Sequence, residues 1–261
     1  MEPSHYAPMI DKMVWSYSRL KAFHDCPYRW YLKYIRHLDG VSGFFAEYGS
    51  FLHKLIELYI TGERTKDELC DGYLSDFRCA VPSPAPNENI FASYFKSGLS
   101  YLEGIKPFPF TPLSVEEKMD FTVDGLPFTG YMDLLGERDG GLYVVDHKSR
   151  ALRPRSGRAV PTKTDRELDE YLLQLYLYAA AVEEKYGRKP KALCFNCFRT
   201  NTFIEEPFLD DAYARAKKWL FDTVEEIRAS REFRPDIEYF KCAHLCEMRE
   251  ACEYYALSKK R

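Results

Sequence analysis

The sequence of 261 residues contains no apolar run of the length, about 18 residues, that a membrane-spanning helix requires. Its first residues, Met1 to Val14, also lack the apolar stretch of a secretory signal peptide. Neither sign of charge dominates, because 37 Lys and Arg stand against 40 Asp and Glu and give a net charge of −3. We therefore expect neither a membrane protein nor a wholesale basic nucleic-acid binder, so any nucleic-acid site must be a local patch.

Internal repeats and low-complexity tracts are also absent. The hydrophobic fraction of 46% is ordinary for a globular protein and excludes global disorder. At roughly 150 residues per domain, the length suits one large domain or two small ones. No long linker separates two candidate cores, so we expect a single domain over residues 1–261.

Eight cysteines are present, but no export signal accompanies them. A chain of this length can build a hydrophobic core without disulfide bonds. We therefore expect a reducing, cytoplasmic location, where clustered thiols are typical ligands of metals or clusters. Four of the cysteines lie outside the set described below and are interpreted as packing residues: Cys70, Cys79, Cys194 and Cys197.

The hydrophobic periodicity changes along the chain and indicates an α/β fold. Helices are predicted over residues 16–36, 47–61, 65–79, 88–104, 168–186 and 209–230. Strands are predicted over residues 113–123, 126–136, 142–148 and 191–199. The elements divide into a helical N-terminal part, about 1–112, a core, about 113–230, and a cysteine-rich tail, about 231–261.

The strongest chemical signal is an acidic hairpin around the dipeptide Asp139-Gly140, which favours a two-residue turn. With that turn, Asp133 and Asp146 face each other across the hairpin with Cβ atoms about 5 Å apart. Like charges at that spacing destabilise a sheet unless something neutralises them, as a divalent cation with oxygen ligands would. Lys148 shares their face because it lies two residues beyond Asp146.

A turn beginning at Gly140 would instead place Asp133 opposite Lys148. These residues would then form an ordinary cross-strand salt bridge on a solvated sheet face. The apolar residues between 142 and 145 make this strand look buried, however. Charged groups at the end of a buried strand favour a functional site.

The order of strand, Asp, turn, strand and Asp-x-Lys resembles the PD-(D/E)XK nucleases, and GYMD with VVDHKS resembles their RecB-type branch. Four further segments resemble motifs of that branch: its cysteine-bearing N-terminal motif (16–35), its histidine motif (49–59), its Gln-x-x-x-Tyr motif (171–179) and the three-cysteine end of its iron–sulfur members (242–252). Those members include AddB-type and CRISPR-associated RecB-like nucleases. Motifs in the family's order make the resemblance specific, whereas any one alone is weak.

The resemblance implies a restriction-endonuclease-like core, in which helices flank a mixed central sheet. It also implies a metal-dependent DNA nuclease that hydrolyses phosphodiester bonds with a metal-activated water, in DNA recombination, repair or processing. Exonuclease action on single-stranded DNA or DNA ends is the commoner behaviour of the family. The helicase motif GxxxxGK(S/T) is absent, so any unwinding would have to come from a helicase or recombination partner.

The resemblance also assigns the catalytic groups. It implies that Asp133 and Asp146 bind Mg²⁺ or Mn²⁺ and that Lys148 is the catalytic lysine. His53 matches the family's histidine, a further metal ligand. Without the motif, a lone histidine on an amphipathic helix is more often a solvated or packed residue.

Two further positions come from the same resemblance. Gln174 and Tyr178 lie four residues apart on one helix face, which in the family contacts nucleic acid or orients catalytic groups. The alternative is a helix surface whose tyrosine packs on the core. A recurring acid of the family matches Glu116, but Glu117 is adjacent and the sequence does not choose between them.

Cys26, Cys242, Cys246 and Cys252 would make a four-thiolate site, which suits either Zn²⁺ or a 4Fe–4S cluster. The resemblance favours the iron–sulfur cluster, because related nucleases tie their two ends together in this way. The tail would then pack back on the Cys26 region. The chain departs from the family in one respect, since three residues rather than two separate Cys242 from Cys246.

A basic segment follows the presumed catalytic strand, with seven Lys or Arg and one Asp between residues 148 and 166. A charge run is usually a solvated loop. Its place beside the catalytic strand favours contact with the phosphate backbone of DNA. The DNA-binding candidates are Arg150, Arg153, Arg155, Arg158 and Lys163.

Two other classes of function stay open. One is a noncatalytic DNA-binding or recombination-accessory module on the same fold, against which the set of two acids and a lysine argues. The other is a zinc-stabilised interaction protein whose hairpin charges form only a salt bridge. Both would lack the metal-dependent hydrolysis that the resemblance implies.

Overall fold

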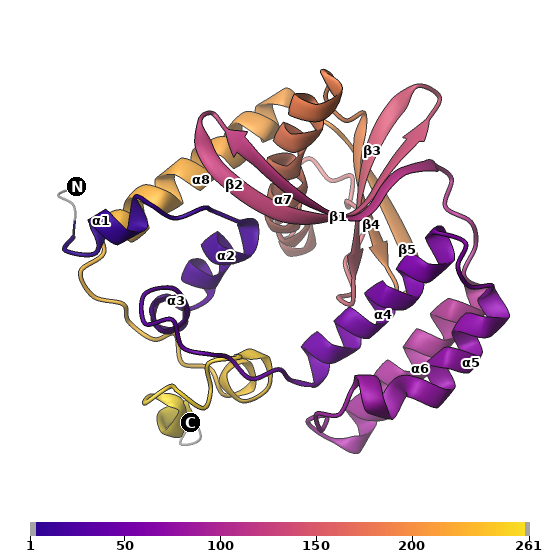
Figure 1. Cartoon of the computed structure of the whole chain (residues 1–261), viewed down its shortest axis with the longest axis horizontal. Helices are drawn as coiled ribbons and strands as arrows, with labels where there is room; N and C mark the ends of the chain where they lie inside the picture. Colours follow the sequence, from indigo (N-terminus) through magenta and orange to yellow (C-terminus); the bar gives the residue numbers. More distant parts are fainter. Residues whose placement is uncertain (1–3, 259–261) are drawn as a thin grey trace.

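The computed structural model describes residues 4–258 and is built around a five-stranded sheet (Figure 1). The strands are β1 (Thr111–Val123), β2 (Leu126–Arg138), β3 (Gly141–Lys148), β4 (Ala192–Cys197) and β5 (Thr202–Pro207). They lie in sequence order, and every neighbouring pair is antiparallel except β3 and β4, which are parallel. The predicted mixed central sheet flanked by helices is confirmed.

Helices make up most of the remaining chain (Figure 1). The N-terminal part contains α1 (Ala7–Ile10), α2 (Tyr17–Asp25), α3 (Pro27–Tyr34), α4 (Phe44–Ile60), α5 (Lys66–Ala80) and α6 (Glu88–Gly104). The later helices are α7 (Lys163–Tyr186), α8 (Asp210–Ala229), a π-helix η1 (Lys241–Leu245) and α9 (Tyr255–Ser258). A parallel strand pair needs a crossover, and α7 supplies it between β3 and β4.

The predicted two-residue turn of the acidic hairpin is confirmed. Asp139 and Gly140 both have positive φ angles, 51° and 70°, as a type I′ turn requires. The strands then pair from Arg138 opposite Gly141 to Leu134 opposite Val145. This register excludes the alternative turn, because a shift would move every pair on the hairpin.

The helix predicted over residues 16–36 is wrong as one element, because the chain breaks at Cys26. Cys26 has extended backbone angles, φ −168° and ψ 105°, and its sulfur caps α3 by accepting the backbone N–H of Arg29. Pro27 explains the break, since proline disfavours a helical conformation in the preceding residue and has no N–H of its own.

Two other boundaries differ from the prediction. Helix α7 begins at Lys163 instead of 168, because Thr162 and Asp165 form a capping box at its start. The strand predicted over 191–199 ends at Cys197, and the chain turns back through Asn201, which has a φ of 50°, into the unpredicted edge strand β5. Asparagine tolerates this left-handed conformation better than most residues.

Helical layers enclose β3 from both sides. On one face, Val144 belongs to a core cluster that includes Leu175 of α7 and Leu220 of α8. On the other face, Val145 packs with Phe110 in a smaller cluster that Ile60 of α4 touches. A separate cluster holds α4, α5 and α6 together. The carboxyl end of β3 therefore emerges between two helical units.

The tail runs back beside α3 and the start of α4 (Figure 1). Arg29 of α3 pairs with Glu247 at 3.0 Å, and the backbone carbonyl of Glu247 accepts the N–H of Val41 at 2.8 Å. The hydroxyl of Tyr28 donates to Glu253 at 2.7 Å. Within residues 4–258, no helix is long and apolar enough to cross a membrane.

Candidate active site

The predicted catalytic groups meet where the β2–β3 hairpin is farthest from its turn. The register places Asp133 and Asp146 one step beyond the pair Leu134 and Val145. Helices α4 and α7 contribute further side chains beside these two acids. The side chains from the strands and from both helices line a pocket of about 750 Å³. The predicted residues that line it are His53, Asp133, Asp146, Lys148, Gln174 and Tyr178.

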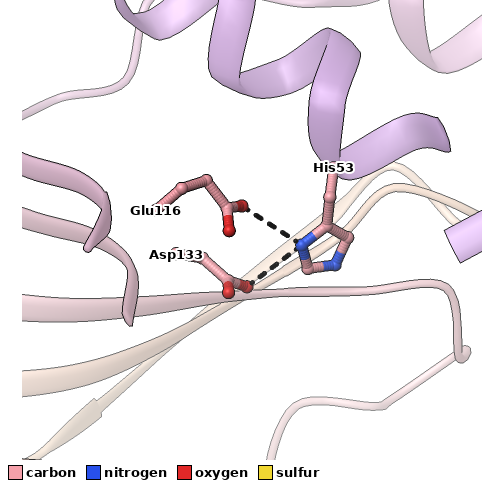
Figure 2. Close-up of side chains that lie close together, drawn as sticks. All are labelled: His53, Glu116 and Asp133. Atoms are coloured by element: carbon pink, nitrogen blue, oxygen red, sulfur yellow. Dashed lines mark hydrogen bonds and ion pairs between the residues drawn. The ribbon is translucent and has the colours of Figure 1, made fainter. Parts of the chain in front are cut away.

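His53 descends from α4 toward two carboxylates, as Figure 2 shows. Its Nδ1 lies 3.4 Å from Oε1 of Glu116 on β1 and 3.6 Å from Oδ2 of Asp133 on β2. The ligand atoms of these three residues all lie within 4.8 Å of one another. One imidazole nitrogen and carboxylate oxygens from three different elements thus converge on one small volume.

The peptide group of His147 ties this cluster to β3. Its N–H donates to Oδ2 of Asp133 at 2.6 Å, and its carbonyl oxygen lies 2.9 Å from Nε2 of His53. The middle residue of the Asp-x-Lys sequence therefore contacts two candidate ligands through its backbone.

Burial makes the cluster electrostatically unfavourable without a cation. Asp133 and Asp146 are only 8% and 4% exposed. Burial raises the pKa of Asp133, and the charge of Asp146 raises it further, to about 7. Burial alone would lower the pKa of His53, but the hydrogen bond to Glu116 and the nearby aspartates outweigh it and raise that pKa to about 9. An oxygen-rich set with one imidazole fits Mg²⁺ or Mn²⁺, whose charge would relieve the repulsion.

Lys148 is held beside the acids by two partners. Its Nζ lies 2.7 Å from Oδ2 of Asp146 and donates to Oε1 of Gln174 at 3.0 Å. The amide of Gln174 donates in turn to the hydroxyl of Tyr178 at 3.3 Å. A Cβ on Gly130 would meet the Tyr178 ring at 2.6 Å, so glycine there leaves room for the ring. The Gln-x-x-x-Tyr face of α7 thus aims the lysine.

The structure distinguishes the two adjacent acids on β1. Glu116 faces His53, whereas Glu117 points away and pairs with Lys185 of α7. The turn at Asp124 and Gly125 sets a register in which Glu116 lies level with Asp133. Asp124-Gly125 is therefore the sequence signal for the position of Glu116, as Asp139-Gly140 is for those of Asp133 and Asp146. Glu116 itself has a φ of 49°, a left-handed conformation that is costly for a side-chain-bearing residue.

Sequence reasoning missed a buried network behind the pocket. The ring of His147 is 2% exposed, and burial lowers its pKa well below the ordinary value, so the ring is neutral. Its Nδ1 lies 3.1 Å from Nδ2 of Asn196 on β4, which also contacts the Tyr101 hydroxyl at 2.7 Å. These residues are far apart in the sequence, and no local pattern signals their contact.

The basic segment is partly paired with acids of the protein itself. Arg150 pairs with Glu167, and Arg155 pairs with both Asp169 and Glu206. The other three candidates, Arg153, Arg158 and Lys163, make no ion pair within residues 4–258.

One buried carboxylate organises this segment. Asp165 accepts hydrogen bonds from the backbone N–H and the hydroxyl of both Ser156 and Thr162, at 2.6 to 2.7 Å. The same carboxylate is part of the capping box that starts α7. The segment is therefore anchored at its middle and at its end.

The four predicted cluster cysteines line one cavity between α3 and the tail. The sulfur of Cys26 accepts the backbone N–H groups of Arg29 and Asp236, both at 3.4 Å. No three of the four sulfurs lie within 4.8 Å of one another. Of the cysteines interpreted as packing residues, Cys194 and Cys197 are buried, but Cys79 is exposed and that interpretation is wrong for it.

Comparisons with known proteins point to one family. The model of the PD-(D/E)XK nuclease superfamily matches residues 14–253. The chain is also 27% identical over 216 residues to a subunit of the ATP-dependent helicase/deoxyribonuclease of Symbiobacterium thermophilum, a match that covers 67% of this chain and 18% of that protein. The corresponding protein from Streptococcus uberis is 27% identical over 153 residues, 51% of this chain and 14% of the relative. The chain thus spans less than a fifth of either relative.

Proposed function

Because the chain belongs to the PD-(D/E)XK nuclease superfamily, we propose that it is a deoxyribonuclease that hydrolyses phosphodiester bonds with the help of Mg²⁺ or Mn²⁺. The finer proposal is exonuclease action on single-stranded DNA or DNA ends, in recombination, repair or DNA processing. The names of the relatives join a helicase with a deoxyribonuclease. They support a helicase or recombination partner for this chain as well.

The observation that carries the proposal is the convergence of acids, imidazole and lysine in one pocket. His53, Glu116 and Asp133 offer ligand atoms within 4.8 Å of one another, and Asp146 lies beside them with Lys148 at 2.7 Å. An ordinary surface salt bridge needs only one acid and one cation. Three carboxylates gathered around one half-buried lysine and one histidine exceed that need.

Each residue has a distinct task in the proposed reaction. His53, Glu116, Asp133 and Asp146 would hold a divalent ion, which would supply Lewis-acid chemistry by lowering the pKa of a water molecule and polarising the phosphoryl oxygen. Lys148 places a positive charge where the phosphate gains negative charge. Gln174 keeps the ammonium group of Lys148 aimed at the pocket through its hydrogen bond of 3.0 Å.

DNA would follow the basic segment away from the pocket. Arg153, Arg158 and Lys163 carry charges that no acid neutralises within the described residues, so they are the first candidates for phosphate contacts. Arg150 and Arg155 would have to exchange a carboxylate for a phosphate. We therefore expect them to contribute less to affinity.

The four cysteines fit a cluster better than a single ion. Sulfurs around one tetrahedral Zn²⁺ are about 3.8 Å apart, given Zn–S bonds of about 2.3 Å. The sulfurs of Cys26, Cys242, Cys246 and Cys252 line one cavity without any three lying within 4.8 Å. Backbone N–H groups directed at Cys26 are typical of thiolate ligands. We propose a 4Fe–4S cluster, with Zn²⁺ as the alternative that iron and sulfide analysis after anaerobic purification would reveal.

The decisive experiment is cleavage of end-labelled single- and double-stranded DNA with Mg²⁺ or Mn²⁺. The parent should cut only when metal is present, and Lys148→Ala should lose about 100-fold or more in rate. Lys185→Ala is the matched control, because Lys185 likewise pairs with a carboxylate, that of Glu117, but lies outside the pocket. Circular dichroism checks the folding of each variant.

The product ladder distinguishes exonuclease from endonuclease action and reports polarity. A parent that is folded and cluster-loaded, binds DNA and never cuts it would overturn the proposal. The noncatalytic accessory module would then be the better interpretation of the fold. Equal loss of rate in Lys148→Ala and Lys185→Ala would remove the assigned role of Lys148.

A further inference from the structure

We infer that exposed and partly exposed aromatic side chains between the catalytic pocket and the tail form a platform on which unpaired bases of single-stranded DNA stack. The inference rests on the proposed nuclease function and names the strandedness of its substrate. We define the aromatic platform as Phe45, Tyr94, Tyr239 and Phe240. Three segments contribute to it: the start of α4, the middle of α6 and the chain just before η1.

The platform is continuous with the catalytic pocket. Phe45 lines that pocket and also lines a neighbouring hollow together with His244 and Arg249 of the tail. His53 and Phe45 lie on the same helix, eight residues apart. Eight residues of α-helix span about 12 Å, the length of a few stacked nucleotides. A strand held at the catalytic groups therefore reaches Phe45 within a few nucleotides.

The rings lie in a connected series. Phe45 is 5.2 Å from Tyr94 and 5.9 Å from Phe240, measured between ring centroids. Phe240 is 5.1 Å from the ring of His244, which lies 6.1 Å from Tyr239. The series leads from α6 across the start of α4 to the tail.

The outer rings are not explained by packing. Tyr239 and Phe240 are 50% and 40% exposed, and neither belongs to a core cluster of the described residues. Neighbouring exposed aromatic residues are costly in water and mark interaction surfaces when they gather. Phe45 and Tyr94 rest on the α4–α6 core but keep part of their surface exposed.

Arginines lie among the rings. The guanidinium of Arg199 stacks over Tyr94 at 4.2 Å and donates to its hydroxyl at 3.1 Å. Arg199 has no acidic partner within residues 4–258. The charge of Arg150, two residues beyond the catalytic Lys148, also acts on Tyr94. Cations beside exposed rings fit a phosphate backbone whose bases stack on the rings.

This chemistry favours one occupant. Aromatic rings beside a cation such as Arg199, which no acid of the described residues neutralises, are the combination by which proteins hold single strands without reading their sequence. In a duplex the faces of the bases are already stacked on one another, so they cannot rest on the platform. An apolar protein surface would leave Arg199 facing no negative charge. The platform therefore takes a single strand.

The test compares a fluorescent twelve-residue oligothymidylate with a blunt duplex of the same length, each bound to the whole cluster-loaded chain without Mg²⁺ or Mn²⁺. Phe240→Ala should weaken binding of the single strand about tenfold, since one base loses its stacking partner. The preference for single strand over duplex should fall by the same factor. Phe240→Trp should restore it, whereas Phe240→Leu, which is apolar but cannot stack, should not.

Two further variants keep the test sharp. Phe203→Ala removes an aromatic ring of similar exposure, 38%, on β5 and outside the pocket, and should leave single-strand binding unchanged. Arg199 lies outside the tail, so Arg199→Gln tests the platform without altering the tail. The slope of log affinity against log salt concentration for the single strand should fall by about one, the value for one phosphate contact. Iron content and circular dichroism show whether the Phe240 variants keep the tail folded.

The outcomes separate this inference from the proposed function. An unchanged preference for single strands in Phe240→Ala, or an equal loss for single strand and duplex, overturns the platform. Binding that Phe240→Leu retains fully also overturns it and favours an apolar protein partner. Failure of the parent to cut any DNA with Mn²⁺ overturns the nuclease function instead, while the binding comparison still judges the platform.

Discussion

The catalytic pocket and the four-cysteine cavity are organised in different ways. In the pocket, strands and helices bring His53, Glu116 and Asp133 within 4.8 Å, and hydrogen bonds hold them before any ion binds. Around the cavity, the tail is a π-helix and turns, and no three sulfurs come that close. The fold therefore brings the groups of the first site together by itself, whereas the proposed cluster would have to organise the second.

The largest expected effect tests the first half of this comparison. Asp133→Asn should lower the rate of DNA cleavage about 100- to 1,000-fold, because a metal-binding carboxylate is lost. Its melting temperature should stay the same or rise, since the amide oxygen can still accept the N–H of His147 and one buried negative charge is gone. Cleavage rates and differential scanning calorimetry measure the two effects. A clear fall in melting temperature would show that the pocket is not organised by the fold alone.

The second prediction addresses the cavity. Cys246→Ser should lower the melting temperature by about 10 °C, because a structural metal group contributes its binding energy to folding. Iron content should fall with it. Cys79→Ser is the matched control, since Cys79 is exposed and does not line the cavity, and should change neither quantity. A variant that loses iron but melts like the parent would mean that the tail folds without its group.

The third prediction concerns the orientation of Lys148 within the pocket. Gln174→Ala removes one of its two partners and should slow cleavage about tenfold, the effect of one hydrogen bond to a charged group. The affinity for DNA should change little, and Gln174→Glu should recover part of the rate because its carboxylate can accept the same bond. Separate measurements of KM and kcat decide this. A change confined to KM would assign Gln174 to DNA binding instead.

The smallest expected effect concerns the basic segment, which, like the catalytic pocket, is held by hydrogen bonds of the protein itself. Four hydrogen bonds from Ser156 and Thr162 hold the pKa of Asp165 well below its ordinary value. A depressed pKa contributes stability that is full above the unfolded value, about 3.9, and is lost as the pH falls toward the folded value. Proteolysis of residues 150–162 should therefore accelerate below about pH 4 in the parent. Asp165→Ala should be cut readily at neutral pH, and equal cutting of both proteins at pH 7 would refute the anchoring role.

The sequence predicts best where a short-range rule governs geometry. The turn at Asp139 and Gly140 sets the register of its hairpin, and from it the positions of Asp133 and Asp146 follow. In the same way, the turn at Asp124 and Gly125 sets the register of the first hairpin and so the position of Glu116 opposite Asp133. In both cases two residues in positive φ determine pairings many residues away.

Other features have no local cause and escaped prediction. The contact of Tyr101 with Asn196 and of Asn196 with His147 arises only when α6, β4 and β3 are packed together. The short edge strand β5 has little hydrophobic alternation of its own and forms by pairing with β4. Pro27 indicates the break at Cys26, but the aromatic and basic periodicity across it favours one continuous helix.

The contact between Cys26 and the tail also has a consequence for biosynthesis. Cys26 lies early in this sequence and the other three cysteines lie late, with more than two hundred residues between them. During translation, the cavity can close only after the segment that carries the other three cysteines has left the ribosome. Contacts of such long range form late and slowly. Loading of the proposed cluster would therefore be a late step that follows folding of the sheet, and chains interrupted before residue 242 would lack three of its four cysteines.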